Sequence, residues 1–268
     1  MRKRLSIIIL GLAMTIGLST TTTFAQTDST STPVDTSKSV FGADNFYTEL
    51  TLASRNVYRG VSYGESPSIM MKGAWMPCNY FEIGVYGNYT MNGTKEGYGN
   101  QFNYYATIKP FANSQTELKN FSITTDDYFY FNSNDSMNNY MEFGSEKTQH
   151  FMESRVKYDG SKLDLTAAYT YYTKENWNVD GIYFEAGYDV SSSLNLFVGY
   201  LTDENALMFQ TKEGFTNAGF TFSRKLTVKQ WSPMLKISTI FSPTYKTIDT
   251  TSPGVGKNPV NFVASLTF

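Results

Sequence analysis

Cysteine and histidine are almost absent from this chain of 268 residues, which contains one of each. A single cysteine, Cys78, excludes an intrachain disulfide. Cys78 and His150 together are too few for the usual zinc sites, which take several such ligands. Long hydrophobic runs are also scarce, because after the N-terminal segment no stretch approaches the ~18 consecutive apolar residues of a transmembrane helix. We therefore expect no metal, no cofactor and no helical membrane span in the mature chain.

Charge is low as well. Lys, Arg, Asp and Glu make up 17 % of the residues, and the formal net charge is -2. A chain with so little positive charge lacks the electrostatic footprint of a nucleic-acid-binding protein. Aromatic residues, in contrast, reach 16 %, with 20 Tyr and 20 Phe. This composition favours strands and disfavours disorder.

The N-terminus has the pattern of a secretory signal peptide. "MRKR" is basic, "LSIIILGLAMTIGL" is apolar and "STTTTFAQ" ends in small residues, which predicts a signal peptide over 1–25 with cleavage after Ala25. The apolar run, of about 14 residues, is short for a membrane span. The alternative is that this run stays as an anchor. Residues 26–44 are rich in Ser, Thr and Asp and are predicted to form a disordered tether.

From Phe46 to the C-terminus, apolar and polar residues alternate in about twelve segments of roughly ten residues each. In "IYFEAGYDV", Ile182 and Phe184 share one face of a strand, and Glu185 and Asp189 share the other. No amphipathic helix interrupts the series, so consecutive strands are expected to pair antiparallel. The segments lie near 46–59, 67–76, 80–91, 101–110, 121–131, 150–158, 163–172, 181–190, 194–201, 215–225, 233–242 and 260–268.

The connections between these segments alternate between long and short. "DGSK" at 159–162 and "SSS" at 191–193 are short, whereas 132–149, 203–214 and 243–258 are long. Long and short connections then fall at opposite ends of the sheet, which is typical of an outer-membrane barrel with periplasmic turns and external loops. Residues 45–268 are therefore predicted to form an all-β, antiparallel up-and-down transmembrane β-barrel of about 12 strands.

Alternation alone does not show which face is outside. A lipocalin-like barrel has its apolar row inside and a membrane barrel has it outside, and a secreted β-sandwich is a further alternative. Three features favour the membrane barrel. Twelve strands enclose more space than small apolar side chains fill, and aromatic residues near strand ends are typical of interfacial girdles. The girdle candidates are Phe46, Tyr58, Trp75, Tyr80, Tyr128, Tyr130, Tyr171, Tyr172 and Tyr200.

The third feature is the C-terminal strand, "VNFVASLTF", which ends on Phe268. A terminal strand of this kind looks like the signal that the barrel-assembly machinery of the bacterial outer membrane reads. Its apolar row would face lipid, and closure against the first strand would remove both edges. We therefore expect a Gram-negative outer-membrane location, with outer-membrane lipid and the assembly machinery as partners and with no nucleic acid.

If the apolar rows face lipid, the opposite rows line the lumen. They carry seven positive and seven negative side chains, a balance that predicts a wet, salt-bridged interior with weak ion selectivity. These charges either neutralise one another inside a narrow barrel or line a permeation route. The predicted pore-lining residues are Glu49, Arg55, Arg59, Lys72, Glu82, Lys109, Asp126, Glu153, Arg155, Lys157, Asp164, Glu185, Asp189 and Lys236.

One residue breaks the alternation. Asp127 falls on the apolar row of its segment, directly after Asp126. Either a bulge shifts the phase of this strand, or Asp127 lies above the membrane.

The segment "SRNVYRGVSYGESPSIMMKGAW" resembles the start of the TorF-like family of outer-membrane porins. In that family a first strand ends in Tyr/Phe-Arg-Gly-Val/Ile-Ser, followed by a Pro and the second strand. "FEIGVYGN" at 81–88 resembles the family's third strand, whereas Lys72 stands where the family often has Gln. The resemblance covers about 46–90 and implies an outer-membrane barrel with a pore, but no particular solute. The matching positions are Tyr58, Arg59, Gly60, Val61, Ser62, Pro67 and Gly73.

Physical chemistry gives two of these matching positions a definite role. Gly60 can take a turn conformation that is closed to other residues. Arg59 can pair with carboxylates in the lumen.

Three functions compete. The first is a porin for passive passage of small hydrophilic solutes, gated by loops such as 132–149. The second is a lipid-active enzyme, for which His150 lies on the outward row at a strand end. Ser154 shares that row but stands ~13 Å away, so a Ser from another strand would be required. The third is a closed structural or adhesion barrel that acts through its external loops. We expect a non-enzymatic protein without catalytic residues.

Overall fold

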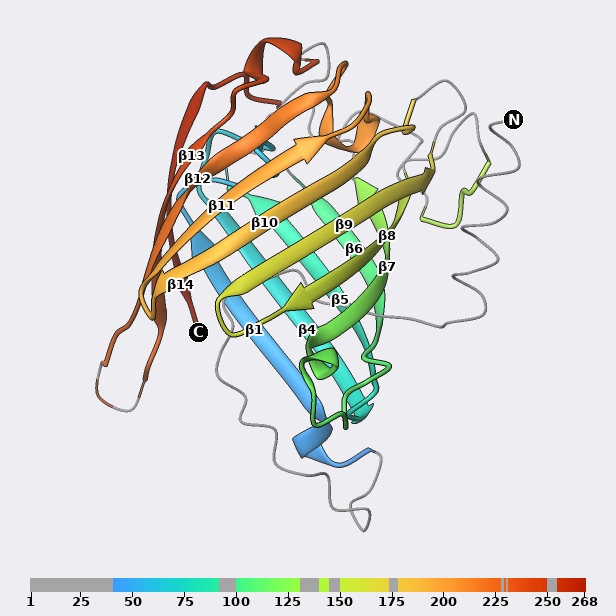
Figure 1. Ribbon diagram of the computed structural model, residues 1–268, viewed down its shortest axis with the longest axis vertical. Helices are drawn as coiled ribbons and strands as arrows, with labels where there is room; N and C mark the ends of the chain where they lie inside the picture. The colour runs from blue at the N-terminus through green and yellow to red at the C-terminus, as the bar shows by residue number, and fades with distance from the viewer. Residues whose placement is uncertain are drawn as a thin grey trace.

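The computed structural model describes residues 41–91, 100–130, 140–144, 150–173, 178–227, 229, 231–249 and 255–268. These residues form a closed all-β barrel of twelve antiparallel strands, as the alternation predicted (Figure 1). The predicted signal peptide and most of the predicted tether lie outside the described residues. The last residues before the barrel form the 3-10 turn η1, beside which Phe41 stacks on Trp75 with ring centroids 5.3 Å apart.

Each wall strand pairs with its neighbours in sequence, and the last strand closes onto the first. The wall consists of β1 (Phe46–Ala53), β4 (Ser68–Cys78), β5 (Phe81–Thr90), β6 (Gln101–Ile108), β7 (Phe121–Tyr130), β8 (His150–Asp159), β9 (Leu163–Tyr172), β10 (Ile182–Ser191), β11 (Leu194–Leu201), β12 (Gly214–Lys225), β13 (Met234–Phe241) and β14 (Val260–Thr267). The connections contain β2 (Val57–Tyr58), β3 (Val61–Ser62) and the 3-10 turns η1 (Ala43–Asn45), η2 (Glu117–Asn120), η3 (Ala206–Met208) and η4 (Tyr245–Thr247).

The first predicted segment, 46–59, was too long. The wall strand β1 ends at Ala53, and the chain then turns inward to form the separate β2–β3 hairpin. The resemblance implied that the Tyr-Arg-Gly-Val-Ser motif ends the first wall strand. The structure places this motif in the hairpin after that strand instead.

The seam between β1 and β14 closes the barrel. Thr51 pairs with Thr267 and Ala53 with Ser265, and the backbone N–H of Phe268 donates to the carbonyl of Leu50 over 2.9 Å. The strand β14 thus completes the ring. Closure removes an exposed edge that would otherwise template pairing with another chain.

The two faces of the wall differ in polarity, in the direction opposite to a soluble barrel. Phe184, Phe220 and Ile237 are exposed on the outside, whereas Glu153 and Thr170 are buried on the inside. Most other outward-facing positions in the middle of the strands are also apolar. This arrangement contradicts the lipocalin-like alternative, in which the apolar row faces inward.

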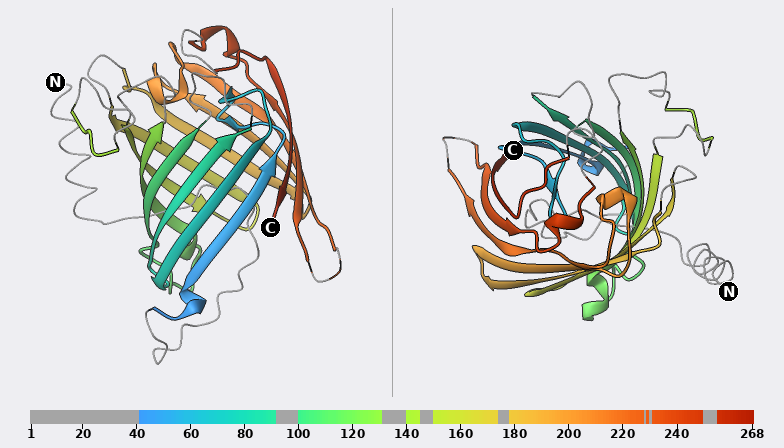
Figure 2. Two further views of the ribbon diagram at one scale, coloured as in Figure 1. Left: turned by 180° about the vertical axis from the view of Figure 1, so that it is seen from behind. Right: turned by 90° about the horizontal axis from the view of Figure 1, so that it is seen from above.

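Long and short connections lie at opposite ends of the barrel, as predicted. The connections 54–67, 202–213 and 242–259 join strands at one end, and the short turns 79–80, 160–162 and 192–193 join them at the other. The connection 109–120, which contains η2, is longer than the other turns at its end. Viewed from above, parts of the long connections lie within the ring of strands (Figure 2).

Candidate functional site: a lumen closed by the first long connection

The charged residues predicted to line a pore lie mainly on the inward face of the wall. Eleven of the fourteen belong to wall strands, Lys109 directly follows β6, and Arg55 and Arg59 belong to the connection after β1. The eleven are Glu49, Lys72, Glu82, Asp126, Glu153, Arg155, Lys157, Asp164, Glu185, Asp189 and Lys236. Arg55 and Arg59 were expected on the first strand, but they reach the interior because the chain bends inward after Ala53.

Several of these charges neutralise one another. Lys72 Nζ lies 3.2 Å from Glu82 Oε1, and Lys157 Nζ lies 3.1 Å from Asp159 Oδ2. Arg155 pairs with Asp126. A further pair lies within the connection after β1, where Arg55 Nη1 is 3.0 Å from Glu65 Oε2. A buried charge is tolerated when an opposite charge and hydrogen bonds compensate for its lost hydration, and these pairs supply that compensation.

The connection after β1 forms a hairpin inside the barrel. We call residues Val57–Ser62 the lumen hairpin. Val57 pairs with Ser62 and Tyr58 with Val61, which leaves Arg59 and Gly60 as a two-residue turn. Both turn residues have positive φ, 50° for Arg59 and 85° for Gly60. Two successive positive φ angles are typical of the type I′ hairpin turn, so the predicted special conformation of Gly60 is confirmed.

The tip of the lumen hairpin is pressed against the wall. A Cβ atom on Gly60 would lie 2.2 Å from the carbonyl oxygen of Thr216, a distance that no side chain tolerates. The hydroxyl of Ser242 donates a hydrogen bond to the carbonyl of Gly60. Glycine is therefore required here by both its φ angle and its surroundings.

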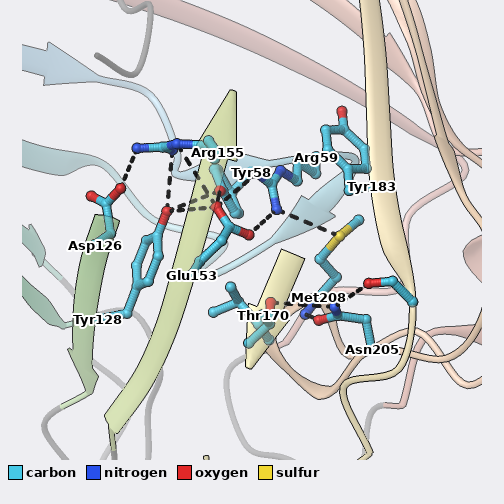
Figure 3. A network of polar contacts seen from close by, with 12 residues as sticks. Tyr58, Arg59, Asp126, Tyr128, Glu153, Arg155, Thr170, Tyr183, Asn205 and Met208 are labelled. Carbon is cyan, nitrogen blue, oxygen red and sulfur yellow. Dashed lines mark hydrogen bonds and ion pairs between the residues drawn. The ribbon is translucent and has the colours of Figure 1, made fainter. Parts of the chain in front are cut away.

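Arg59 projects from this tip into a buried network of polar contacts (Figure 3). Its two terminal nitrogens donate to the two carboxylate oxygens of Glu153 on β8, with Nη2 2.9 Å from Oε1. The guanidinium also lies over the rings of Tyr58 and Tyr183, 4.7 Å and 4.2 Å from their centroids. A bidentate pair flanked by aromatic faces is the strongest arrangement available to an arginine, and it confirms the predicted pairing of Arg59 with a lumenal carboxylate.

A second set of contacts surrounds this pair. The Tyr128 hydroxyl donates to Glu153 Oε1 over 3.3 Å and accepts from Arg155 Nη1 over 3.2 Å. The Tyr58 hydroxyl lies 3.1 Å from the Tyr128 hydroxyl. Burial raises the pKa of the Tyr58 hydroxyl to about 12, although the charge of Arg59 opposes this shift. Tyr58 therefore stays neutral over the physiological range and remains available as a donor.

Apolar residues complete the closure. Val61 and Tyr63 pack against Leu207 and Phe209 of the connection after β11 and against Ile248 of the connection after β13. On the wall they meet Tyr128, Tyr130 and Phe151. The Tyr63 hydroxyl donates to the carbonyl of Leu207. Three long connections thus meet and pack together inside one end of the barrel.

Three tyrosines were therefore assigned wrongly from the sequence. Tyr58, Tyr128 and Tyr130 were expected in an interfacial girdle, but they belong to this interior cluster. Tyr128 and Tyr130 could have been assigned to the interior from the sequence. They lie two and four residues after the inward-facing Asp126, so the alternation of the strand places them on the same face. Tyr183 was not identified either, although it has the same parity as the predicted lumenal residue Glu185.

A separate polar cluster lies on the outer face of the wall. His150 and Asp127 face outward from β8 and β7, and residues 140–144, here called the outer strap, cover them. His150 Nδ1 lies 2.7 Å from Asp127 Oδ1, and His150 Nε2 lies 2.8 Å from the carbonyl oxygen of Tyr140. The ring of Phe143 stacks on the imidazole with centroids 4.2 Å apart. His150 is fully buried by these contacts.

This cluster explains the exception at Asp127. The register of β7 with β6 and β8 is continuous, so no bulge shifts the strand. Asp127 instead stays on the outward row and is shielded there by the outer strap, whose Tyr140 hydroxyl donates to Asp127 Oδ2 over 2.7 Å. The described part of loop 132–149 thus lies outside the wall rather than over the lumen. The rest of that loop lies outside the described residues.

The same geometry bears on the chemistry of His150. Nδ1 of His150 is directed at Asp127 and Nε2 at the Tyr140 carbonyl. A histidine that activates a serine needs a ring nitrogen directed at that serine, and the two nitrogens of His150 are directed at these partners instead. Ser154 lies farther along the same strand, with its hydroxyl 3.1 Å from that of Thr125.

Across the described ranges, no group of three or more His, Cys, Asp or Glu side chains is arranged to hold a metal ion. Within the same ranges, no helix is long and apolar enough to cross a membrane.

Comparison with known proteins shows a distant structural likeness. No protein-family model matches the chain, and no curated protein matches it. Among solved structures, the chain is similar to one described as "KdgM porin", with a TM-score of 0.42 and 11 % sequence identity. The match covers 82 % of this chain and 97 % of that chain. A likeness of this size carries no argument about function, so the proposals below rest on the residues of this chain.

Proposed function

We propose that the protein is a bacterial outer-membrane β-barrel that allows passive passage of small hydrophilic solutes. The observation that carries this proposal is the reversed polarity of the wall. Glu82, Asp126 and Lys157 are buried inside, whereas Phe184 and Phe222 are exposed outside. Such a wall is stable only if the outer face meets acyl chains and the inner face meets water or other polar groups.

The two ends of the barrel support an orientation in the membrane. The short turns would face the periplasm and the long connections the exterior, as in other barrels of this class. The C-terminal residue Phe268 would be read by the assembly machinery together with the rest of β14. The resemblance of residues 46–90 to the TorF-like family agrees with this assignment, and the solute stays open.

The alternative that a specific observation favours is a closed barrel that acts through its external loops. In the described conformation the lumen hairpin, η3 and the segment near η4 fill one end of the barrel. A barrel closed permanently in this way would conduct nothing, and its loops would be the working part. The porin proposal therefore requires that this closure is reversible.

The lipid-active enzyme has less support. It needs a histidine that accepts a proton from a serine, and both nitrogens of His150 are engaged with acceptors. No other histidine exists in the sequence. The buried Asp127–His150 pair is better explained as the anchor of the outer strap.

Conductance measurement tests the porin proposal. Purified protein in detergent is added to a planar lipid bilayer, and detergent alone serves as the control. We expect discrete current steps from the wild-type protein, and they should be infrequent because the described conformation is closed. Swelling of liposomes in small uncharged sugars gives a second readout. If neither the correctly folded wild-type protein nor a variant without the lumen hairpin gives current or swelling, the closed barrel is favoured.

A further inference from the structure

We propose that the lumen hairpin is the gate of the pore and that the Arg59–Glu153 ion pair is its latch. This inference rests on the proposed porin function. It assigns the gating to the connection after β1, whereas the sequence pointed to loop 132–149.

The first argument is the position of the hairpin tip. It contacts Glu153 on β8, Tyr183 on β10 and the Thr216 carbonyl on β12. Ser242, directly after β13, holds the Gly60 carbonyl. In the ring order, β8 and β13 are five places apart in a barrel of twelve strands, so the tip bridges nearly opposite walls. A segment with this span closes the lumen in cross-section.

The second argument is that the hairpin can leave without damage to the barrel. Its pairing is internal: β2 and β3 form their own two-stranded sheet, and the N–H of Tyr63 donates to the Asn56 carbonyl over 2.9 Å. It is held to the wall strands through side chains, above all through Arg59. Outward movement would therefore exchange those side-chain contacts for water and leave the hydrogen bonds of the twelve wall strands intact.

The hairpin also touches one neighbouring connection through its backbone. The N–H of Gly256 donates to the carbonyl of Ser62 over 2.9 Å. The segment that carries Gly256 would therefore move with the hairpin or release it. The hinge positions on either side of the hairpin lie in the same connection, between Ser54 and Pro67.

The third argument is the energetic character of the latch. In the closed state, Arg59 and Glu153 compensate each other's burial, and both would regain hydration when the hairpin leaves. Open and closed states can then lie close in free energy, because the attraction and the desolvation cost of a buried pair largely cancel. Removing only one partner is different. Without Arg59, Glu153 stays buried with only the more distant Arg155, whose Nε lies 3.9 Å from its Oε1, and without Glu153 the guanidinium of Arg59 stays buried in the closed state without its bidentate partner. Single neutralisation should therefore open the gate.

The test compares latch variants in planar bilayers and in liposomes. Arg59→Gln and Glu153→Gln should each raise the fraction of time spent open, and the solute flux, at least about tenfold over the wild type. The charge-swapped double variant, Arg59→Glu with Glu153→Arg, should return both values toward the wild type. Asp127→Asn is the matched control: it neutralises a carboxylate that is paired with His150 on the outer face of the wall, away from the lumen and the hairpin.

A hairpin deletion separates failure of the gate from failure of the pore. In this variant a short Gly-Ser linker replaces residues 56–63, and folding of every variant is verified by its heat-modifiable mobility on gels. High flux from the deletion, with single latch variants indistinguishable from the wild type, would overturn the latch while the porin proposal stands. No flux from a folded deletion variant would overturn both. A swapped pair that stays as open as the single variants would also contradict the latch.

Discussion

Asn261 and Phe262 are adjacent in β14 and differ almost completely in exposure. The side chain of Asn261 is 1 % exposed and lies inside the barrel, whereas Phe262 is 68 % exposed on the outer wall. A soluble protein would place these two residues the other way round. This pair shows the main physical property of the molecule, which is a polar interior within an apolar exterior.

The first prediction concerns charge on the two faces of β13. Ile237 is exposed on the outer wall and Ser238, the next residue, faces the lumen beside Thr221. Ile237→Arg should destabilise the barrel in lipid by about 2–4 kcal/mol, because an arginine near the middle of the bilayer is poorly solvated. Ser238→Arg should cost far less. Denaturant titrations of both variants in phospholipid vesicles measure the difference, and equal losses would count against the assigned faces.

The second prediction concerns the turn of the lumen hairpin. Gly60→Ala should displace the hairpin, because the residue has a φ of 85° and an added Cβ would meet the Thr216 carbonyl. The expected cost to the closed state is about 1–3 kcal/mol. It should appear as faster hydrogen exchange of residues 57–62 and as a higher solute flux.

Gly73→Ala on β4 is the control for this change. A Cβ at that position would make only an ordinary contact, 3.6 Å from a methyl group of Val85. A wild-type exchange rate in Gly60→Ala, or an equal change in both variants, would contradict the role assigned to the turn.

The comparison of sequence with structure shows which information is local. Period-2 alternation predicted all twelve wall strands, because alternate residues of each strand face the interior and the exterior and differ in polarity accordingly. The long end and the short end followed from the lengths of the connections in the same way. Closure of the last strand against the first was also predicted, whereas the register of that seam was not.

The interior of the barrel was less accessible to such reasoning. The pair of Arg59 and Glu153 joins residues 94 positions apart, and no local pattern specifies which carboxylate an arginine meets. The motif Arg59–Gly60 did predict a special turn and an ion pair, but not that the turn folds into the lumen. Long connections carry little periodicity, so the path of residues 54–67 could not be derived. Asp127 was recognised as an exception, but its partner Tyr140 lies 13 residues later in a loop without periodicity, so the strap could not be derived.

The third prediction concerns the outer strap. Asp127→Asn should weaken the attachment of residues 140–144 to the wall, because it replaces the carboxylate that accepts from the Tyr140 hydroxyl and contacts His150 Nδ1. The local free energy of opening should fall by about 1–3 kcal/mol. Hydrogen exchange measured by mass spectrometry on the peptide containing 140–144 detects this change.

Glu142→Gln is the control for the strap, because Glu142 is exposed and its carboxylate accepts from the N–H of Gly144 within the strap itself. Protection of the strap that is unchanged in Asp127→Asn would contradict the proposed anchor. The same proteins offer a check on lipid hydrolysis. We expect none above background from the wild type or from His150→Ala, and activity that depends on His150 would revive the enzyme hypothesis.

The fourth prediction concerns ion selectivity. The predicted lumenal set contains equal numbers of positive and negative residues, and several of them are paired in the structure. The open pore should therefore discriminate weakly between K⁺ and Cl⁻, with a reversal potential near zero under a salt gradient. Lys72→Glu should shift this potential toward cation selectivity. A strongly selective wild-type pore would contradict this prediction. It would show that individual unpaired charges govern permeation rather than the equal numbers of positive and negative residues.

The most direct test of the central claim is an accessibility scan along β14. Cys78→Ser gives a background without cysteine, since Cys78 is the only one in the sequence. Single cysteines are then introduced at each position from 260 to 267, and each is labelled with a fluorophore in vesicles that contain a lipid-bound quencher. We predict quenching at alternate positions, strong at 262 and 264 and weak at 261 and 265. Absence of the two-residue period, or stronger quenching at 261 and 265, would contradict an apolar exterior that faces lipid.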